Sequence, residues 1–395
     1  GQIPQLELTR VDVCEGVALG LANVDVFRSA DFCTRFILAA LRLGEPSRVV
    51  RAIALEADLL AVQARTRRAT KLLATLEALV AEHPTPQATS VLYTTQGLVD
   101  FGCHNRWRSA HERLSEAMSL YLAHESAIDF ELNTVDMFRC MALDQLGDWP
   151  ELSRRLPALV EAAIRRGDRY ASVIFRVVFA TPWLMRDEAA EGEAQVSAAI
   201  DEWGAARDHY QLQHMFALVS RCNLALYQGD AARAQALLAA EEPQLRRSLL
   251  HLPPSNRLLL EQLRGRIQAA VATSSATSAP ERKRAVAGAR ATARWLRRTP
   301  HPAGRVIARV VEGSAARALG DDGRCAAEWA GAEREFDGLE MAIWAASVRW
   351  QRGKLLGGGE GAALCARAEA EMAARDVARP DRLAPSIVPG LTGAG

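Results

Sequence analysis

Residues 130–203 carry the pattern that decides the fold, and they read FELNTVDMFRCMALDQLGDWPELSRRLPALVEAAIRRGDRYASVIFRVVFATPWLMRDEAAEGEAQVSAAIDEW. A first helical stretch ends at Gly147, where Asp148 supplies a capping side chain and Pro150 suits a first helical turn. The same alternation of helix and short turn then repeats as far as Trp203. The next helix carries one apolar stripe, made of Leu152, Leu156, Leu159 and Ala163. The stretch therefore predicts helix hairpins without strands.

Turns recur along the chain at a nearly constant interval. They fall at Gly102, Gly147, Asp187, Gly229 and Gly320, about 40 to 46 residues apart if the last gap holds two units. A fixed period of this size is typical of stacked hairpins that bury their apolar faces on one another. We therefore predict an all-α protein, a right-handed α-solenoid of antiparallel, tetratricopeptide-like helix hairpins.

The same signals place helices along the rest of the chain. We expect them at 6–21, 31–43, 48–63, 67–82, 90–101, 107–124, 209–228, 231–240, 254–272, 281–297, 305–319, 324–336, 341–356 and 361–375. Pro157 and Pro182 lie inside expected helices and should kink them. Residues 171–180 are rich in β-branched side chains and also fit a buried strand, but their place between two helices favours a helix. Trp203 continues an apolar stripe and is expected in the core.

One low-complexity segment, 272–279 (ATSSATSA), predicts a flexible loop. We expect it to separate two arrays of repeats. The predicted organisation is an N-terminal array at 1–271, a loop at 272–280, a C-terminal array at 281–379 and a tail at 380–395. A solenoid can carry a chain of 395 residues as one body.

Composition gives no argument for nucleic acid or membrane, and neither is expected as a partner. The formal net charge is +1 with both signs interspersed, and no apolar run reaches the roughly 18 residues of a membrane helix. Seven scattered cysteines without a C-x-x-C pair predict reduced thiols in a cytoplasmic protein. A basic run around Trp295 fits either an anionic partner or, as we favour, a solvated helix face. The absence of an initial Met suggests a piece of a longer protein.

Residue patterns for catalysis are missing from the sequence. It contains no G-x-x-x-x-G-K-[ST] phosphate loop, and the glycine-rich stretch 357–361 predicts a turn. His209 and His214 are five apart and lie on different sides of their helix, while His104 and His111 are seven apart and have no third ligand near them. We therefore expect no catalytic, cofactor-binding or metal-binding residue, and no enzymatic activity in this chain.

Several segments nevertheless resemble one protein family. They are 30–35 (ADFCTR), 41–46 (LRLGEP), 48–52 (RVVRA), 131–134 (ELNT), 166–170 (RGDRY), 212–214 (LQH), 246–250 (RRSLL) and the region 353–391. Together they make nearly the whole chain resemble the C-terminal region of large bacterial multidomain serine/threonine protein kinases. In that family a kinase domain and a STAND-type signalling ATPase precede tetratricopeptide-like repeats.

The resemblance implies a regulatory arm and no catalytic residue. The kinase H-R-D and D-F-G motifs and the ATPase phosphate loop are missing here, and 336–338 (FDG) only echoes the second motif. ATP and Mg would belong to the missing modules of a parent resembling an ATP-dependent kinase, so no cofactor is expected in this chain. We expect a non-catalytic sensor or scaffold that recognises a protein, a peptide or a small-molecule effector. The alternatives are an enzyme with a site in a cleft between the arrays, and an oligomerisation arm; the oligomeric state stays open.

In tetratricopeptide-like stacks the first helix of each hairpin lines the concave side, which locates a candidate groove. Its polar residues are Asn133, Asp136, Arg169, Arg176, Tyr210, His214 and Arg221. One interpretation, which we favour, is that acidic and basic faces pair internally across the groove. The other is that Arg176, His214 and Arg221 hold an anionic or peptide ligand while Tyr210 stacks beside it.

Overall fold

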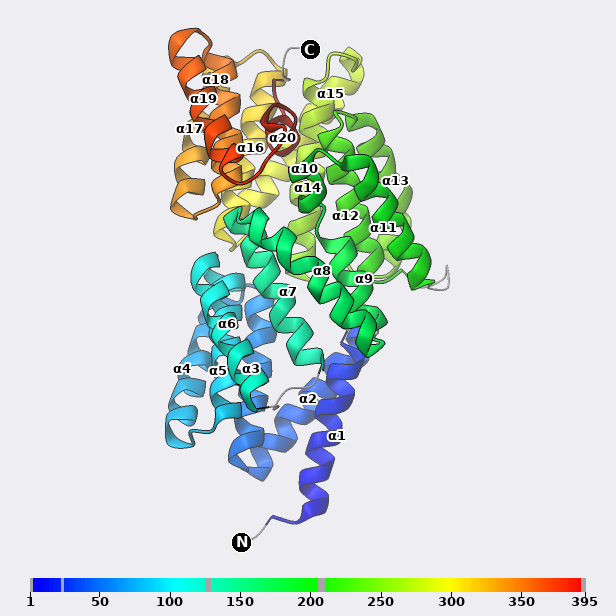
Figure 1. The fold of residues 1–395 in the computed structure, drawn as a ribbon, viewed down its shortest axis with the longest axis vertical. Helices are drawn as coiled ribbons and strands as arrows, with labels where there is room; N and C mark the ends of the chain where they lie inside the picture. The colour runs from blue at the N-terminus through cyan, green and yellow to red at the C-terminus, as the bar shows by residue number, and fades with distance from the viewer. Residues whose placement is uncertain (1–2, 23–24, 125–128, 205–209, 392–395) are drawn as a thin grey trace. The chain divides into compact units, whose positions relative to one another are not determined.

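The computed structural model describes residues 3–22, 25–124, 129–204 and 210–391. These residues form twenty α-helices and one π-helical turn, and they contain no strand (Figure 1). The predicted all-α architecture of helical repeats is confirmed. The handedness of the stack stays a prediction.

The chain divides into two compact units, unit 1 at residues 1–142 and unit 2 at residues 143–395. This division differs from the predicted one, which placed a boundary at 272–280. Helix α7 begins in unit 1 and ends in unit 2. The helices of unit 1 are α1 (Gln5–Leu21), α2 (Val26–Leu43), α3 (Pro46–Val62), α4 (Thr66–Glu82), α5 (Pro86–Val99), the π-helical turn η1 (Asp100–His104), α6 (Trp107–His124) and the first part of α7 (Asp129–Leu146).

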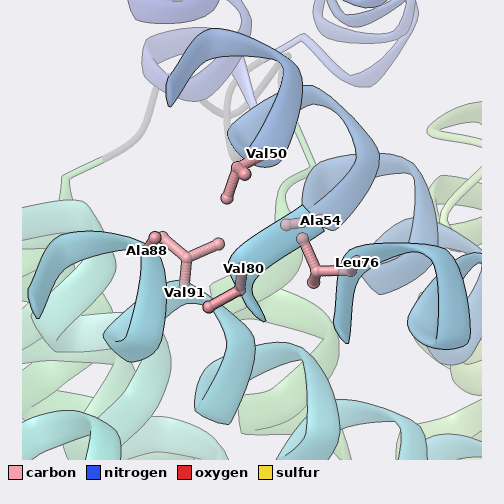
Figure 2. Close-up of a cluster of buried hydrophobic side chains, with 6 residues drawn as sticks. All are labelled: Val50, Ala54, Leu76, Val80, Ala88 and Val91. Atoms are coloured by element: carbon pink, nitrogen blue, oxygen red, sulfur yellow. The ribbon is translucent and has the colours of Figure 1, made fainter. Parts of the chain in front are cut away.

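Unit 1 is held together by small apolar clusters between consecutive helices. In one of them the side chains of α3, α4 and α5 converge, as Figure 2 shows for Val50, Ala54, Leu76, Val80, Ala88 and Val91. These side chains recur at helical spacing on each helix, so the pairing of apolar stripes follows from the sequence pattern. Helix α3 packs against both α4 and α5, which continues the stack from one hairpin to the next.

Unit 2 repeats the hairpin pattern over a longer stretch. Its helices are α8 (Trp149–Arg166), α9 (Arg169–Val178), α10 (Thr181–Arg186), α11 (Ala189–Trp203), α12 (Leu212–Tyr227), α13 (Ala231–Arg247), α14 (Pro254–Thr273), α15 (Ala279–Arg297), α16 (Pro302–Ala318), α17 (Asp322–Gly338), α18 (Ala342–Leu356), α19 (Gly358–Ala373) and α20 (Pro380–Ile387). The first helices of successive hairpins pack in series, α9 on α12, α12 on α14 and α14 on α16.

The stretch that contains residues 171–180 and Pro182, expected as one kinked helix, is two helices in the structure, α9 and α10. The chain leaves the helical conformation at Phe179, which is extended, and restarts shortly before Pro182. A proline cannot donate a backbone hydrogen bond inside a helix, so the break lies where the kink was predicted. The β-branched run itself is helical, because burial of Val173, Ile174 and Val177 against neighbouring helices outweighs strand propensity. Pro157 lies inside α8, which continues to Arg166.

The segment 272–280 does not separate two arrays. Helix α14 runs to Thr273 and α15 begins at Ala279, and the two helices pack against each other. Val271 and Ala272 are buried. The segment is therefore the turn of one hairpin, midway between Gly229 and Gly320, where the period requires a turn. Its low complexity reflects the few side-chain constraints on such a turn.

The expected tail at 380–395 is largely folded. Residues 380–387 form α20, and Leu383, Ala384 and Val388 are fully buried in unit 2. Its last four residues lie outside the described part of the chain. The sequence concealed this element because a helix of eight residues shows barely two turns of periodicity.

The cysteines and Trp203 differ in how deeply they are buried. None of the seven cysteines forms a disulfide, and five of them are buried. Trp203 is only half-buried, because it is the last residue of α11, whereas Val196 and Ala199 of the same stripe are fully buried. Within the described residues, no helix combines the length and apolar character needed to cross a membrane.

Candidate functional site

The seven candidate residues are divided between the two units. Asn133 and Asp136 lie half-buried on α7 in unit 1. Asp136 forms an ion pair with Arg139 one turn later, with 2.8 Å between its Oδ1 and the Nη1 of the arginine. Arg169, Arg176, Tyr210, His214 and Arg221 lie in unit 2.

Arg169 and Arg176 connect α9 to the end of α11. The guanidinium of Arg176 pairs with the carboxylate of Glu202, and Arg169 donates to the backbone carbonyl of the same residue. Arg169 also lies over the ring of Trp203, 5.8 Å from its centre. Both arginines therefore have partners within the fold.

Tyr210 and His214 lie together at the start of α12. The Tyr210 hydroxyl donates to Glu241 at 2.7 Å, and the Tyr210 and His214 rings are 5.4 Å apart. The Nδ1 of His214 accepts the backbone N–H of Gln211 at 3.1 Å, which caps the helix. Burial lowers the pKa of His214 below its ordinary value, so this ring is neutral at pH 7 and has no charge for an anion.

Arg221 connects α12 to α11. It donates to Ser197 Oγ at 3.0 Å, and its Nε lies 3.5 Å from the Glu193 carboxylate, which Arg233 of α13 also contacts. These contacts give Arg221 partners on the second helix α11, and the expected pairing of acidic and basic faces across the groove stays a prediction. His209, which was not expected to bind a metal together with His214, lies outside the described residues.

The structure brings some of the candidates together and leaves others apart. The charge of Arg221 acts on both Tyr210 and His214, so these three form one cluster with Glu241. Their bonds run to α11 and α13, which are the second helices of their hairpins. Arg176 instead pairs with Glu202 at the end of α11. The hydrogen bonds of this cluster thus join α12 to second helices, whereas the repeat pattern assigns the first helices to the groove.

A different set of side chains, which lies on or next to the first helices of the hairpins, holds the segment 377–391. Helix α20 packs against α12, α18 and α19 (Figure 1). Groups at the C-terminal end of α10 and on α14 and α18 make polar contacts to the segment, and two residues of α12 hydrogen-bond to the side chains that make them. We call this surface the first-helix face; its polar members are Asp187, Asn223, Tyr227, Arg266 and Gln351.

Most of these contacts are made to the main chain of the segment. Arg266 donates to the carbonyl of Ser386 at 2.7 Å, and its other terminal nitrogen donates to Asn223 Oδ1 at 3.0 Å. The amide of Gln351 makes two bonds to Leu391, donating to its carbonyl at 2.8 Å and accepting its N–H at 2.9 Å. The Ala378 N–H donates to the Met185 carbonyl at 2.8 Å. The polar contacts to the segment are therefore made chiefly to atoms that every peptide has.

Apolar side chains fix the position of the segment along the face. Leu383, Ala384, Ile387 and Val388 are buried. Gly390 lies so close to Trp329 that a Cβ on it would be 2.5 Å from the far edge of the indole, and Trp329 itself is fully buried. The site therefore accepts apolar residues four apart, followed by a residue without a side chain.

Two charged side chains contribute further contacts: Arg382 of the segment and Arg266 of the face. Arg382 forms an ion pair with Asp187 at 3.0 Å, and Tyr227 donates to the same carboxylate oxygen at 2.9 Å. Burial lowers the pKa of Arg266 to about 10, which still leaves the guanidinium charged at neutral pH. Trp344 lies 5.5 Å from it and provides an aromatic surface for the charge.

The described residues give little support to metal or reaction chemistry at this face. They contain no group of three or more His, Cys, Asp or Glu side chains that could hold a metal ion. An open hollow of about 530 Å³ lies beside the start of the segment, lined by Glu369, Ala370, Ala373 and residues 377–381. A second hollow, of about 250 Å³, lies between α13, α14 and α15.

The first-helix face was not predicted from the sequence, because the candidate residues were chosen on the polar side of each helix, opposite its apolar stripe. Arg266 instead lies within a stripe, since Leu263, Ile267 and Ala270 are three before, one after and four after it. A charge at such a position is a usable signal of a buried, partnered group. Gln351, which is fully buried on α18, follows Val348 by three residues in the same way.

Comparison of the sequence with protein-family models and with curated proteins finds no match in either.

Proposed function

We propose that this chain is a non-catalytic recognition module and that the first-helix face of unit 2 binds a peptide segment of a partner protein. One observation supports the proposal most. Gln351 and Arg266 bond to backbone atoms of the segment 377–391, while its apolar side chains fill buried positions. Backbone bonds provide affinity for any extended or helical peptide, and the apolar positions select its sequence.

The alternatives that the sequence left open have less support. A cleft between two arrays would lie at 272–280, where α14 and α15 pack directly against each other. Two open hollows have been described, and neither shows a nucleophile, an acid and a base converging on one point. For an oligomerisation arm, the structure offers no specific observation in its favour.

The cellular context of the module follows only from the resemblance. On that basis we propose a cytoplasmic regulatory arm of a bacterial signalling kinase or ATPase, in which peptide binding at the repeats is transmitted to catalytic modules elsewhere. No role for nucleic acid, membrane or cofactor enters this proposal.

The proposal is tested by selecting peptides on a chain whose face has been opened. Leu383→Asp places a charge at a fully buried position of the segment and should detach it. We call this variant the opened chain. Random peptides of the same length as the segment are displayed and selected on it, with circular dichroism confirming that α-helix content is retained.

The expected outcome is enrichment of peptides with two aliphatic residues four apart and a small residue after them. The matched control replaces Gln351 by Ala in the opened chain, which should abolish enrichment because the backbone bonds are lost. Equal enrichment on both chains, or none on a folded opened chain, would contradict the proposed function.

A further inference from the structure

We propose that the segment 377–391 is an intramolecular ligand of the first-helix face, which an incoming partner peptide displaces. This inference rests on the proposed function and adds its regulation: the binding surface is closed by the chain itself until a competing peptide opens it.

The helix in the segment is poorly suited to exist on its own. It has eight residues, with Pro380 in its first turn and Pro385 in its interior. A helix of this length is unstable in water, and an interior proline removes one of its few hydrogen bonds. Helix α20 is therefore stable only while docked, and we expect the segment to dock and detach as one piece.

The segment begins directly after a fixed helix end, about which it can detach. Helix α19 ends at Ala373, and the Val377 N–H donates to the Met372 carbonyl at 3.2 Å, which closes the helix. Residues 377–381 border the open hollow of about 530 Å³. The start of the segment thus lies next to unfilled space, whereas its end is enclosed by Trp329 and Gln351.

The contacts define the chemistry of the competing peptide. Its backbone must satisfy Gln351 and Arg266, as that of Leu391 and Ser386 does. A basic residue opposite Asp187 takes the place of Arg382. The sequence of the occupant, RLAPSIVPG at 382–390, gives the pattern of a basic residue, then aliphatic residues four apart and next to each other, then glycine.

Hydrogen exchange of the unaltered chain tests the inference. If the segment detaches locally, amides of 383–391 should exchange at least about tenfold faster than those of α12 and α18, because local opening is more frequent than unfolding of the unit. An excess of an isotopically heavy synthetic copy of 377–391 should accelerate exchange of the native segment further, since the copy occupies the vacated face.

The inference is overturned if the amides of 383–391 exchange at the same rate as those of α12 and α18 and the synthetic copy has no effect. The segment would then be an integral part of the core. That result would leave the proposed function standing if the opened chain still selects peptides. Failure of the opened chain to bind any peptide, with fast local exchange in the unaltered chain, would instead reject the proposed function.

A matched pair of glycine substitutions provides a second test. Gly390→Ala introduces a Cβ against Trp329, whereas Gly338→Ala at the end of α17 introduces one with no atom within 4 Å. We expect Gly390→Ala to accelerate exchange in 383–391 several-fold and to leave α12 and α18 unchanged. Gly338→Ala should change neither. If Gly390→Ala instead accelerates hydrogen exchange equally throughout unit 2, the segment does not open separately from the rest of the unit.

Discussion

At the scale of single residues, the most informative side chains are charged groups that the fold has buried with partners. Arg349 on α18 is 2 % exposed and contacts three carboxylates, those of Glu333, Asp337 and Glu371. Glu312 on α16 is likewise enclosed by Arg290, Arg297 and Arg324. Arg290 and Arg297 belong to the basic run around Trp295 and pair with this buried acid, whereas Arg294 and Arg298 of the same run are exposed, as expected for a solvated face.

Replacing Arg349 by Ala should be strongly destabilising. The change removes one of the two arginines that pair with the buried Glu333, and breaking a buried ion pair typically costs about 3 to 5 kcal/mol. Chemical denaturation of the variant checks the value. Arg367→Ala, which removes a largely exposed arginine from the same Glu371, is the control and should cost much less, because solvent screens an exposed ion pair. Similar costs for both variants would contradict this description of the network.

Asp58 on α3 should make the stability of the protein depend on pH. Burial raises the pKa of this carboxyl from 3.8 to about 7. Between those two values the folded state holds a proton that the unfolded state has released, so stability is lost as the pH rises through this window and is constant above it. Asp58→Asn removes the effect. Relative to this variant, the free energy of unfolding of the native chain should fall by on the order of 1 to 3 kcal/mol between about pH 4 and about pH 8. If the stability difference between the native chain and Asp58→Asn does not change with pH, the Asp58 carboxyl is ionised throughout this range.

At the scale of elements, close backbone approach explains why the π-helical turn η1 contains a glycine. A Cβ on Gly102 would overlap the carbonyl of Ala61 on α3, so only glycine permits this contact. Ala61, Leu98 and Cys103 form one buried cluster there. The glycine was predicted from the sequence as a turn, whereas its role as a point of helix contact depends on a neighbour 41 residues away, which periodicity does not reveal.

Gly102→Ala should therefore destabilise unit 1 by about 1 to 3 kcal/mol, the usual cost of overpacking. Gly16→Ala on α1 adds the same methyl group where nothing lies within 4 Å, and it should stabilise the helix by up to about 1 kcal/mol. Thermal denaturation of both variants measures the two effects. Equal changes in Tm would show that the contact with Ala61 is not tight.

The helices themselves were largely predictable, because long apolar stripes and capping residues are local signals. The break between α9 and α10 was predictable from Pro182 for the same reason. Helix α20 was not, since its eight residues and two prolines give no clear period and its stability comes from α12 and α18. The candidate site had the same limit: Tyr210, His214 and Arg221 were chosen by helical spacing alone, and the spacing does not show which neighbour each face of α12 meets.

At the scale of the whole molecule, the two compact units should unfold separately. Each contains its own apolar clusters or buried ion networks, and α7 runs from one into the other. We expect Gly102→Ala to lower one unfolding transition and Arg349→Ala to lower the other in differential scanning calorimetry. A single transition that both substitutions lower equally would show that the chain unfolds as one cooperative body.

The central claim is that the first-helix face of unit 2 recognises peptides and is closed by the chain's own segment. Its most direct test is fluorescence anisotropy with a labelled synthetic copy of 377–391. The opened chain should bind the copy in the micromolar range. The unaltered chain should bind it at least about tenfold more weakly, because only its open fraction is competent. A variant with Leu319→Asp, at an exposed position, should behave as the unaltered chain does. No binding to an opened chain that retains its fold would contradict the claim.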